Sequence, residues 1–374
     1  MKKLCGKSFA LPLKKTIAAF LAVTASFLTV SAASPSVYGQ PLLGAAGVAS
    51  KQRFLSLQTA VQTANESVAQ NTTAQINLMT IIEENRLDAS NFPETLPEKT
   101  LEALEKLCDS RLYAISFYYY DVTTGYTISY EADRTFRGAS SIKLPYISYV
   151  FDLIDNEKVN FDDKITLYSS DIRNGTSEIR DKKFPAGTQF TVKQLIEYLM
   201  VNSDNTAFAM LNRTYTIGSF VTWANGKYGT NFYGGRDRNG NSGNSMTAAS
   251  AGRMLRLIYE RAASGNENYK WLLEIMKTAN KNTFVKSGLS DNIAITWSSK
   301  VTPDCEVSHK YGMDVYASND VALVHYEDRP YILVILTDWV GTSSDGSYWS
   351  EGDMRTVSYY IYQLHKYMVK LQTQ

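Results

Sequence analysis

The chain has 374 residues, of which 44% are hydrophobic, so it is long enough for one large domain or two smaller ones with a sizeable core. Its 38 basic and 37 acidic residues give a formal net charge of +1, which does not indicate a nucleic-acid partner. The three histidines have no metal-ligand spacing. The composition therefore predicts a globular protein that needs no metal and no other cofactor.

Residues 1–32 have the pattern of an export signal. Five lysines precede an apolar run at residues 17–30, and Val30-Ser31-Ala32 supplies a small-residue cleavage site. The run is short for a membrane span, and an uncleaved anchor is the alternative. We expect a secreted protein whose mature chain, with 33 basic and 37 acidic residues, has a net charge of about −4. Cleavage leaves Cys108 and Cys305, and the sequence leaves open whether they form a disulfide.

Residues 33–96 form a predicted extension. Residues 33–50 are rich in Ala, Ser, Gly and Pro and indicate a linker. Between residues 52 and 84, apolar residues at Phe54, Leu57 and Val61 continue at spacings of three and four, which favours an amphipathic helix. This helix is interpreted as a solvated stalk or as a cover on the main domain, with a self-associating coiled coil as the alternative.

Residues 97–374 form the predicted main domain. It opens with a helix at 97–110, is mostly helical from 140 to 279, and closes with a helix at 354–371. Strands are expected at residues 112–121, 126–131, 307–316, 321–326 and 331–338. Strands at both ends of a helical middle predict an antiparallel sheet with helices packed on it and a helical insertion.

Three short motifs carry the chemistry. Ser140 and Lys143 are three residues apart, so their side chains share one helix face and the lysine amine can act as a base on the serine hydroxyl. Ser203-Asp204-Asn205 supplies a second hydroxyl and an amide after an apolar helix. Lys310-Tyr311-Gly312 supplies a second lysine. This set suits an acyl-serine enzyme that works without histidine.

A second Ser-Asp-Asn begins at Ser290 and differs from the first only by its place in the chain. It follows Gly288-Leu289, and Ser, Asp and Asn all favour turns, so we interpret Ser290 as a turn residue.

The order of these motifs resembles that of the class A β-lactamases and, more broadly, the penicillin-recognising serine enzymes. The resemblance extends to Arg137-Gly138-Ala139 before the nucleophile, to residues 184–188, and to Asn319-Asp320-Val321-Ala322 after the Lys-x-Gly strand. It implies a three-layer α/β/α part with a five-stranded antiparallel sheet, plus an all-α subdomain, with the site between them.

The resemblance also implies roles for the site residues. Ser140 would be the nucleophile and Lys143 its base, with Ser203 relaying a proton under the influence of Lys310. Asn205 would hold the substrate amide. Gly312 would let substrate approach the strand, and the backbone N–H groups of Ser140 and Met313 would form the oxyanion hole. Asp204 is expected to be structural.

Two departures from the family pattern affect the predicted activity. The sequence has no glutamate between Glu197 and Glu260, where class A enzymes carry the residue that activates the deacylating water; only Asp237 offers a carboxylate in the matching loop. Tyr311 stands where the family usually has Thr or Ser in contact with the substrate carboxylate. A bulkier phenol there is expected to narrow the site.

The sequence therefore predicts an acyl-serine hydrolase acylated by β-lactams and slow to deacylate. The alternatives are a D,D-peptidase or penicillin-binding protein acting on peptidoglycan stem peptides, and a non-catalytic binding or sensor domain with the same fold. The motifs specify neither the true substrate nor the oligomeric state.

Overall fold

The computed structural model describes residues 87–92, 97–111, 114–228, 244–279, 284–290, 305–314, 316–338 and 349–373. All of them belong to Asn77–Gln374, the second of two compact units in the chain. The predicted export signal, the linker, most of the helical extension and Asp237 lie outside the described residues.

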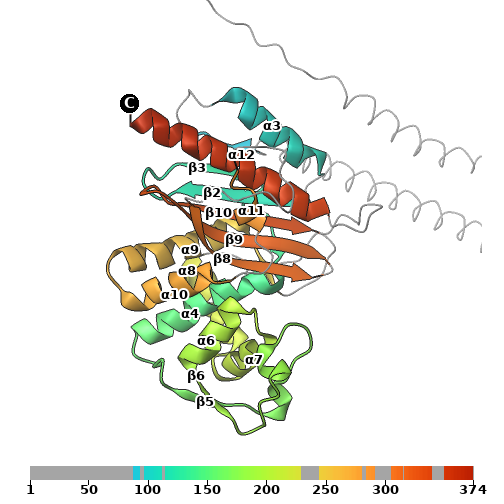
Figure 1. The fold of residues 1–374 in the computed structure, drawn as a ribbon, viewed down its shortest axis with the longest axis vertical. Coiled ribbons are helices and arrows are strands. Elements are labelled where there is room, and N and C mark those ends of the chain that lie inside the picture. The colour runs from blue at the N-terminus through green and yellow to red at the C-terminus, as the bar shows by residue number, and fades with distance from the viewer. Residues whose placement is uncertain are drawn as a thin grey trace, which may run out of the picture. The chain divides into compact units, whose positions relative to one another are not determined.

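An antiparallel sheet forms the centre of this unit (Figure 1). Its strands, in spatial order, are β1 (Leu87–Asp88), β3 (Thr127–Tyr130), β2 (Ile115–Asp121), β10 (Tyr331–Asp338), β9 (Ala317–Tyr326) and β8 (Cys305–Asp314). The five predicted strands are confirmed, and the two-residue β1 adds a sixth. Because β1 comes from the segment assigned to the extension, part of that segment belongs to the sheet; the domain boundary at residue 97 stays a prediction.

Local chemistry explains the hairpin between β2 and β3. Asp121 Oδ1 accepts hydrogen bonds from the backbone N–H groups of Thr123, at 2.8 Å, and Thr124, at 3.2 Å. Gly125 has a φ of +77°, in the left-handed region that glycine adopts without strain. This Asx-type turn fixes the register in which Tyr120 lies opposite Thr127.

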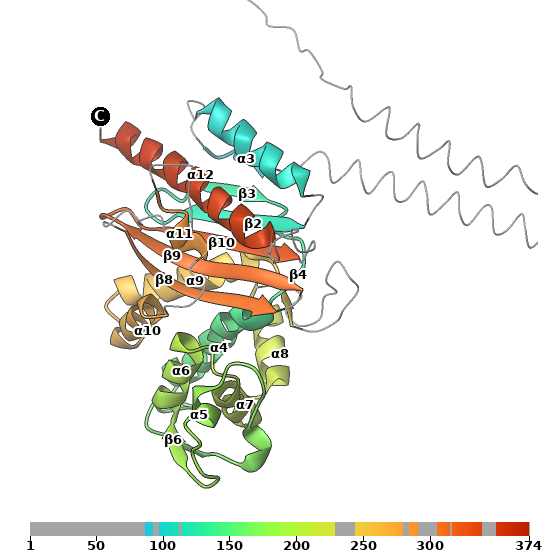
Figure 2. The same cartoon turned by 45° about the vertical axis from the view of Figure 1, so that its right-hand side comes forward.

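Helices cover both faces of the sheet, and this is why all eight residues of β10 are buried. On one face lie α3 (Glu98–Ser110), α11 (Phe284–Ser287) and α12 (Trp349–Gln372), as Figures 1 and 2 show. On the other lies α9 (Ala248–Ala263), which packs against β2, β9 and β10. Two apolar clusters, one on each face, form the core. The predicted three-layer α/β/α part is confirmed.

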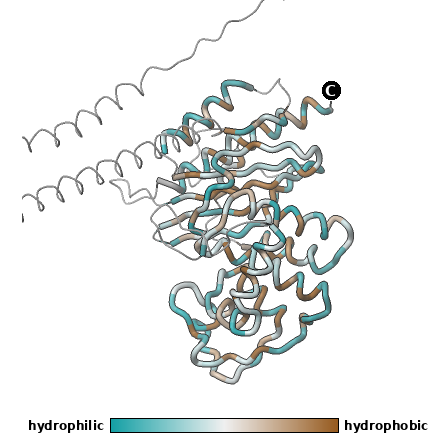
Figure 3. The backbone as a smooth tube through the Cα atoms, turned by 180° about the vertical axis from the view of Figure 1, so that it is seen from behind, coloured by the Kyte–Doolittle hydropathy of each residue, from teal (hydrophilic) through white to brown (hydrophobic). Residues whose placement is uncertain are grey.

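In the chain, the helical subdomain comes after α3, β2 and β3. It contains α4 (Lys143–Asp155), α5 (Glu178–Asp181), α6 (Val192–Val201), α7 (Asn205–Thr214) and α8 (Ile217–Tyr228), with the small strand pair β5 (Lys164–Thr166) and β6 (Gln189–Thr191). Helix α10 (Glu267–Lys277) packs chiefly against α9 and β8. Thr191 and Gln194 exchange hydrogen bonds in a capping box that starts α6. Hydrophobic stretches concentrate on the inner helices, and the outer loops are mostly hydrophilic (Figure 3). The predicted helical insertion is confirmed.

In the described part of the chain, no helix combines the length and the apolarity that crossing a bilayer requires. Cys108 and Cys305 are both buried, and no disulfide joins them. Burial, with Asp109 nearby, raises the pKa of the Cys108 thiol well above its usual value.

Candidate active site

The segment that carries Ser140 is held in a strained turn. Strand β4 (Phe136–Arg137) pairs with β7 (Ser245–Met246), and a 3₁₀ turn, Ala139–Ile142, leads directly into α4. Ala139 has a φ of +44°, which is costly for a residue with a Cβ. The half-buried Ser140 follows it at the start of the helix. A strained residue beside a helix N-terminus is typical of a functional site, because the turn exposes the serine where backbone N–H groups favour negative charge.

Lys143 is buried beneath the second motif. Its Nζ donates to Ser203 O and Asn205 Oδ1, both at 2.7 Å, and lies 3.3 Å from Ser203 Oγ. These bonds direct the amine toward the Ser-Asp-Asn turn, whereas the motif spacing alone had predicted contact with Ser140. Burial lowers the pKa of Lys143 to about 7, against the opposing charge of Asp204. Near neutral pH the amine is therefore present in both its protonated and its free-base form.

The Ser203-Asp204-Asn205 turn presents its hydroxyl and its amide to the same side as Lys143. Ser203 is 2% exposed and has a φ of +56°, a second strained residue in the site. Asp204 caps α7 through Oδ1, which accepts from Thr206 N and Ala207 N at 2.7 and 2.9 Å. It is structural, as predicted.

The amide of Asn205 is oriented from both ends. Its Oδ1 accepts from Lys143, and its Nδ2 donates to Asn174 O at 3.1 Å. Gly175, with a φ of +80°, passes so close that a Cβ there would lie 2.9 Å from Nδ2. These contacts fix which side of the amide faces the lysine.

Lys310, on β8, completes a chain of polar groups. Its Nζ donates to Ser203 Oγ at 3.0 Å and to Tyr311 O at 2.9 Å, and the side chain is fully buried. Burial and the charge of Lys143 lower the pKa of Lys310 well below its usual value, although Asp320 opposes the shift. The hydroxyl of Ser203 thus lies between two amines that are poised to exchange protons with it.

The strand after Lys310 lies against the nucleophile turn. A Cβ on Gly312 would lie 2.2 Å from Ser141 N, 2.8 Å from Gly138 O and 2.9 Å from Ser140 N, so only glycine fits. Met313 follows with its side chain 40% exposed. The structure therefore brings the backbone of Gly312 beside that of Ser140, and the place of the next residue, Met313, in the oxyanion hole stays a prediction.

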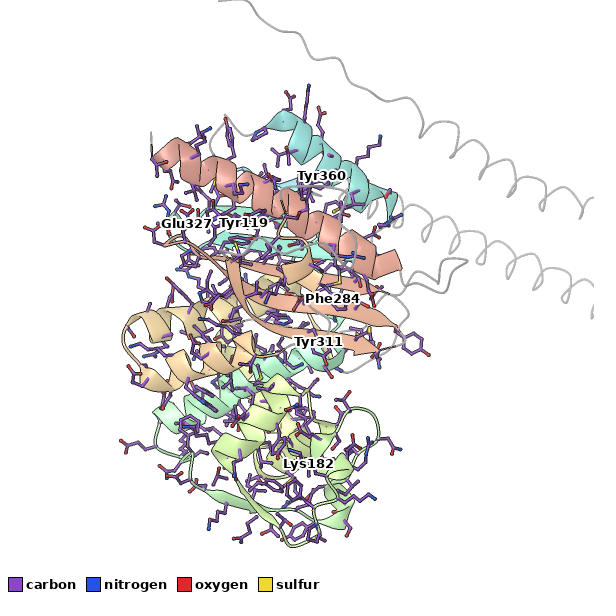
Figure 4. All side chains as sticks on the ribbon, in the orientation of Figure 1. Tyr119, Lys182, Phe284, Tyr311, Glu327 and Tyr360 are labelled. Atoms are coloured by element: carbon purple, nitrogen blue, oxygen red, sulfur yellow. The ribbon has the colours of Figure 1, made fainter. Side chains whose placement is uncertain are left out.

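Tyr311 was expected to narrow the site with its phenol, but its side chain points elsewhere. Its side chain is 7% exposed and belongs to the apolar cluster on the α11 and α12 face of the sheet, with Phe284 (Figure 4). Its ring centroid lies 4.4 Å from Lys310 Nζ. Burial raises the pKa of the Tyr311 phenol. The residue covers Lys310 and packs into the core.

Sequence reasoning missed a buried ion pair beside Lys310. His309 Nδ1 lies 2.9 Å from Asp320 Oδ1, and His309 Nε2 lies 2.8 Å from Ala279 O. Because carboxylate and carbonyl oxygens only accept hydrogen bonds, the ring donates from both nitrogens and is protonated. Burial opposes this charge, but Asp320 and the hydrogen bond to Ala279 O together outweigh it, and the pKa of His309 is raised. No sequence signal paired these residues, because their contact depends on the strand register.

No group of three or more His, Cys, Asp and Glu side chains among the described residues is arranged to hold a metal ion.

The fold defines the class of protein. A PBP-A mutant in an acyl-enzyme complex with penicillin G is similar with a TM-score of 0.60 and 19% identity, over 74% of this chain and 99% of that chain. A β-lactamase from Chitinophaga pinensis is similar with a TM-score of 0.58 and 17% identity, over 71% of this chain and 99% of that one. The chain has the fold of the class A β-lactamases and PBP-A.

The sequence comparisons give the family. A β-lactamase from Streptomyces fradiae is 33% identical over 118 residues, which are 31% of this chain and 37% of that protein, so the match spans little more than a third of the relative. The β-lactamase enzyme family matches residues 97–353. The chain belongs to the β-lactamase enzyme family.

Proposed function

We propose that the protein is an exported acyl-serine hydrolase of the class A β-lactamase type, acylated at Ser140 by β-lactams or related amides. The observation that carries the proposal is the position of Ser203 Oγ, 3.3 Å from Lys143 Nζ and 3.0 Å from Lys310 Nζ, beside the nucleophile turn. Burial lowers the pKa of both amines, and that of Lys143 to about 7, so Lys143 can take up and return a proton near neutral pH, as acyl transfer to a serine requires.

In the proposed acylation, the free-base form of Lys143 accepts the proton of Ser140 as Oγ attacks the substrate carbonyl carbon. The oxyanion that develops is stabilised by the N–H groups of Ser140 and Met313. The carbon–nitrogen bond then breaks, and the proton passes from Lys143 through Ser203 to the leaving nitrogen. Lys310 polarises the hydroxyl of Ser203 and attracts a substrate carboxylate. The product is an ester on Ser140.

Deacylation is proposed to be slow. The sequence between Glu197 and Glu260 contains no glutamate that could activate a water on the ester. A positioned general base typically contributes about 10²–10⁴ in rate, so its loss should slow hydrolysis of the acyl-enzyme by a factor in that range. Asp237 is the candidate substitute. Rapid turnover that Asp237→Asn abolishes would assign it that role.

A D,D-peptidase or penicillin-binding protein acting on peptidoglycan stem peptides is the second candidate. The absence of the glutamate from the sequence favours it, and the similarity to PBP-A structures is compatible with it. Both candidates use the same acylation step and differ in the fate of the acyl-enzyme. A non-catalytic domain with this fold would not be acylated.

Labelling with a fluorescent penicillin, with intact-mass measurement over time, separates these functions. We expect a long-lived adduct on the wild-type protein and none on Ser140→Ala. Ser203→Ala should slow labelling, while Ser290→Ala, in the second Ser-Asp-Asn, is the matched control and should label at the wild-type rate. Rapid release of hydrolysed penicillin would indicate an efficient β-lactamase. Absence of any adduct would refute the enzyme proposal, and an adduct that persists in Ser140→Ala would remove this serine from the mechanism.

Export is proposed from residues 1–32. The expected mature protein begins after Ala32 and is found outside the cytoplasm. N-terminal sequencing of the protein recovered from the producing cell tests this, because an intact Met1 in a membrane fraction would indicate an uncleaved anchor.

A further inference from the structure

The proposed oxyanion hole is divided between two segments that are far apart in the sequence. Ser140 N lies in the turn after β4, and Met313 N lies near the end of β8. The approach of these segments is tightly limited, since a Cβ on Gly312 would already lie 2.2 Å from Ser141 N. Two N–H groups that share one oxyanion need a fixed separation, because a misplacement of about 1 Å can reduce the rate by about 10²-fold.

The buried side-chain amide of Asn319 links the two segments. Asn319 lies opposite Gly312 in the β8–β9 register and is 0% exposed. Its Nδ2 donates to Arg137 O at 2.7 Å and to Gly138 O at 3.0 Å, and its Oδ1 accepts from Thr337 N at 3.0 Å. The side chain therefore binds the residues just before Ser140 to β9 and β10, and β9 pairs directly with β8, the strand that carries Lys310 and Gly312.

An ion pair joins the same segments at the surface. Arg137 Nε donates to Asp314 Oδ2 at 2.6 Å, and both side chains are 27% exposed. The other carboxylate oxygen, Asp314 Oδ1, accepts from Tyr316 N at 2.8 Å, and the Arg137 guanidinium lies 5.4 Å from the Tyr316 ring centroid. Arg137 precedes Ser140 by three residues and Asp314 follows Met313 directly. The pair therefore connects the outer ends of both oxyanion-hole segments.

We infer that Arg137, Asp314 and Asn319, called here the clasp, are positioning residues that set the separation of the Ser140 and Met313 N–H groups for acylation. The inference rests on the proposed function for its rate effect, but not for its effect on the backbone. Asn319 supplies the buried part of the clasp and the Arg137–Asp314 pair supplies the exposed part. Water reaches both side chains of this pair and screens its charges, so the pair contributes less to global stability than a fully buried one. Its removal should therefore change the geometry of the hole more than the stability of the fold.

Arg137→Gln and Asp314→Asn test the exposed part without removing a buried group. Arg256→Gln is the matched control, because Arg256 Nε also donates to a carboxylate, that of Glu260 at 2.6 Å, and its guanidinium also lies over a ring, that of Tyr120 at 4.6 Å. Arg256 lies on α9 and touches none of the proposed site residues in these interactions.

The measurement is the rate constant of acylation by a fluorescent penicillin at saturation, together with the affinity of the non-covalent complex. We expect each clasp variant to lower the rate constant by about 10-fold to 100-fold at unchanged non-covalent affinity. Arg256→Gln should leave both values at the wild-type level. The double variant Arg137→Asp with Asp314→Arg should recover part of the lost rate, since it restores the pair with exchanged charges.

Hydrogen exchange separates the failure of this inference from the failure of the proposed function. Peptides covering residues 136–144 and 310–316 should exchange faster in both clasp variants than in the wild-type protein and in Arg256→Gln, whether or not the protein reacts with penicillin. An unreactive wild-type protein with faster exchange in the variants would refute the proposed function and keep the clasp. Unchanged exchange in these peptides, or unchanged acylation rates in both single variants of a reactive protein, would overturn the clasp.

Discussion

The substitution Asn205→Asp tests the role of Lys143 through its protonation state. Asn205 Oδ1 lies 2.7 Å from Lys143 Nζ, so the substitution places a carboxylate against the amine with almost no change in shape. The lysine has a pKa of about 7 because burial disfavours its charged form. An opposite charge at this distance favours the charged form and typically raises a pKa by about 1–3 units.

The size of the change in acylation rate depends on the fraction of Lys143 that is in the free-base form. A lysine with an unperturbed pKa of about 10.4 has roughly 0.04% free base at pH 7, whereas a pKa of about 7 gives about half. The wild-type acylation rate should therefore rise about tenfold from pH 5 to pH 6 and level off above pH 8. In Asn205→Asp the midpoint should move to about pH 8–10, so the rate at pH 7 falls by about 5-fold to 500-fold and recovers in alkaline buffer.

The assay is the acylation rate of a fluorescent penicillin from pH 5 to pH 10. Asn174→Asp is the control, because Asn174 contacts Asn205 through its backbone carbonyl while its own side chain is exposed, and water screens a charge placed there. This variant should shift the midpoint little. A wild-type rate that does not change across pH 7, or the same midpoint in Asn205→Asp, would contradict the assignment of Lys143 as the base.

Three further outcomes are expected from the packing. Gly312→Ala should reduce acylation by at least about 100-fold, since its Cβ would lie 2.2 Å from Ser141 N; wild-type rates in this variant would contradict the close approach. Burial lowers the pKa of His365 to about 4, so between pH 4 and 6.5 the folded state binds fewer protons than the unfolded state. The contribution of His365 to the free energy of unfolding should therefore fall by about 3 kcal/mol as the pH drops through that window. Urea unfolding at several pH values should show this slope in the wild-type protein and a smaller one in His365→Gln. Deleting residues 33–86 should preserve folding and acylation. Deleting residues 33–96 also removes β1 and Phe92, which packs on Tyr119 and Tyr126, and should lower the free energy of unfolding by about 3 kcal/mol. Equal stability of the two deletion variants would show that these contacts contribute little.

The sequence by itself determined the principal elements and the chemical groups of the site. The apolar run Tyr331–Asp338 was predicted with its observed bounds, because a strand buried on both faces has an uninterrupted hydrophobic pattern. The order of the three motifs was enough to select Lys143, Ser203 and Lys310, whose polar groups the structure brings together. Gly312 was expected to let substrate approach the strand, whereas the structure shows that it lets the backbone of the nucleophile turn approach.

Only the tertiary structure decided how these groups act on one another. Whether Lys143 contacts Ser140 or the Ser203 turn depends on the path of a segment 60 residues away, and its pKa depends on burial, which no local pattern encodes. The side of the sheet that Tyr311 covers depends on the register and twist of β8. The joining of Arg137 to Asp314 depends on two segments 177 residues apart. Local sequence specifies backbone preference and side-chain chemistry, but distances between segments and the dielectric around a charge arise only when the whole chain packs.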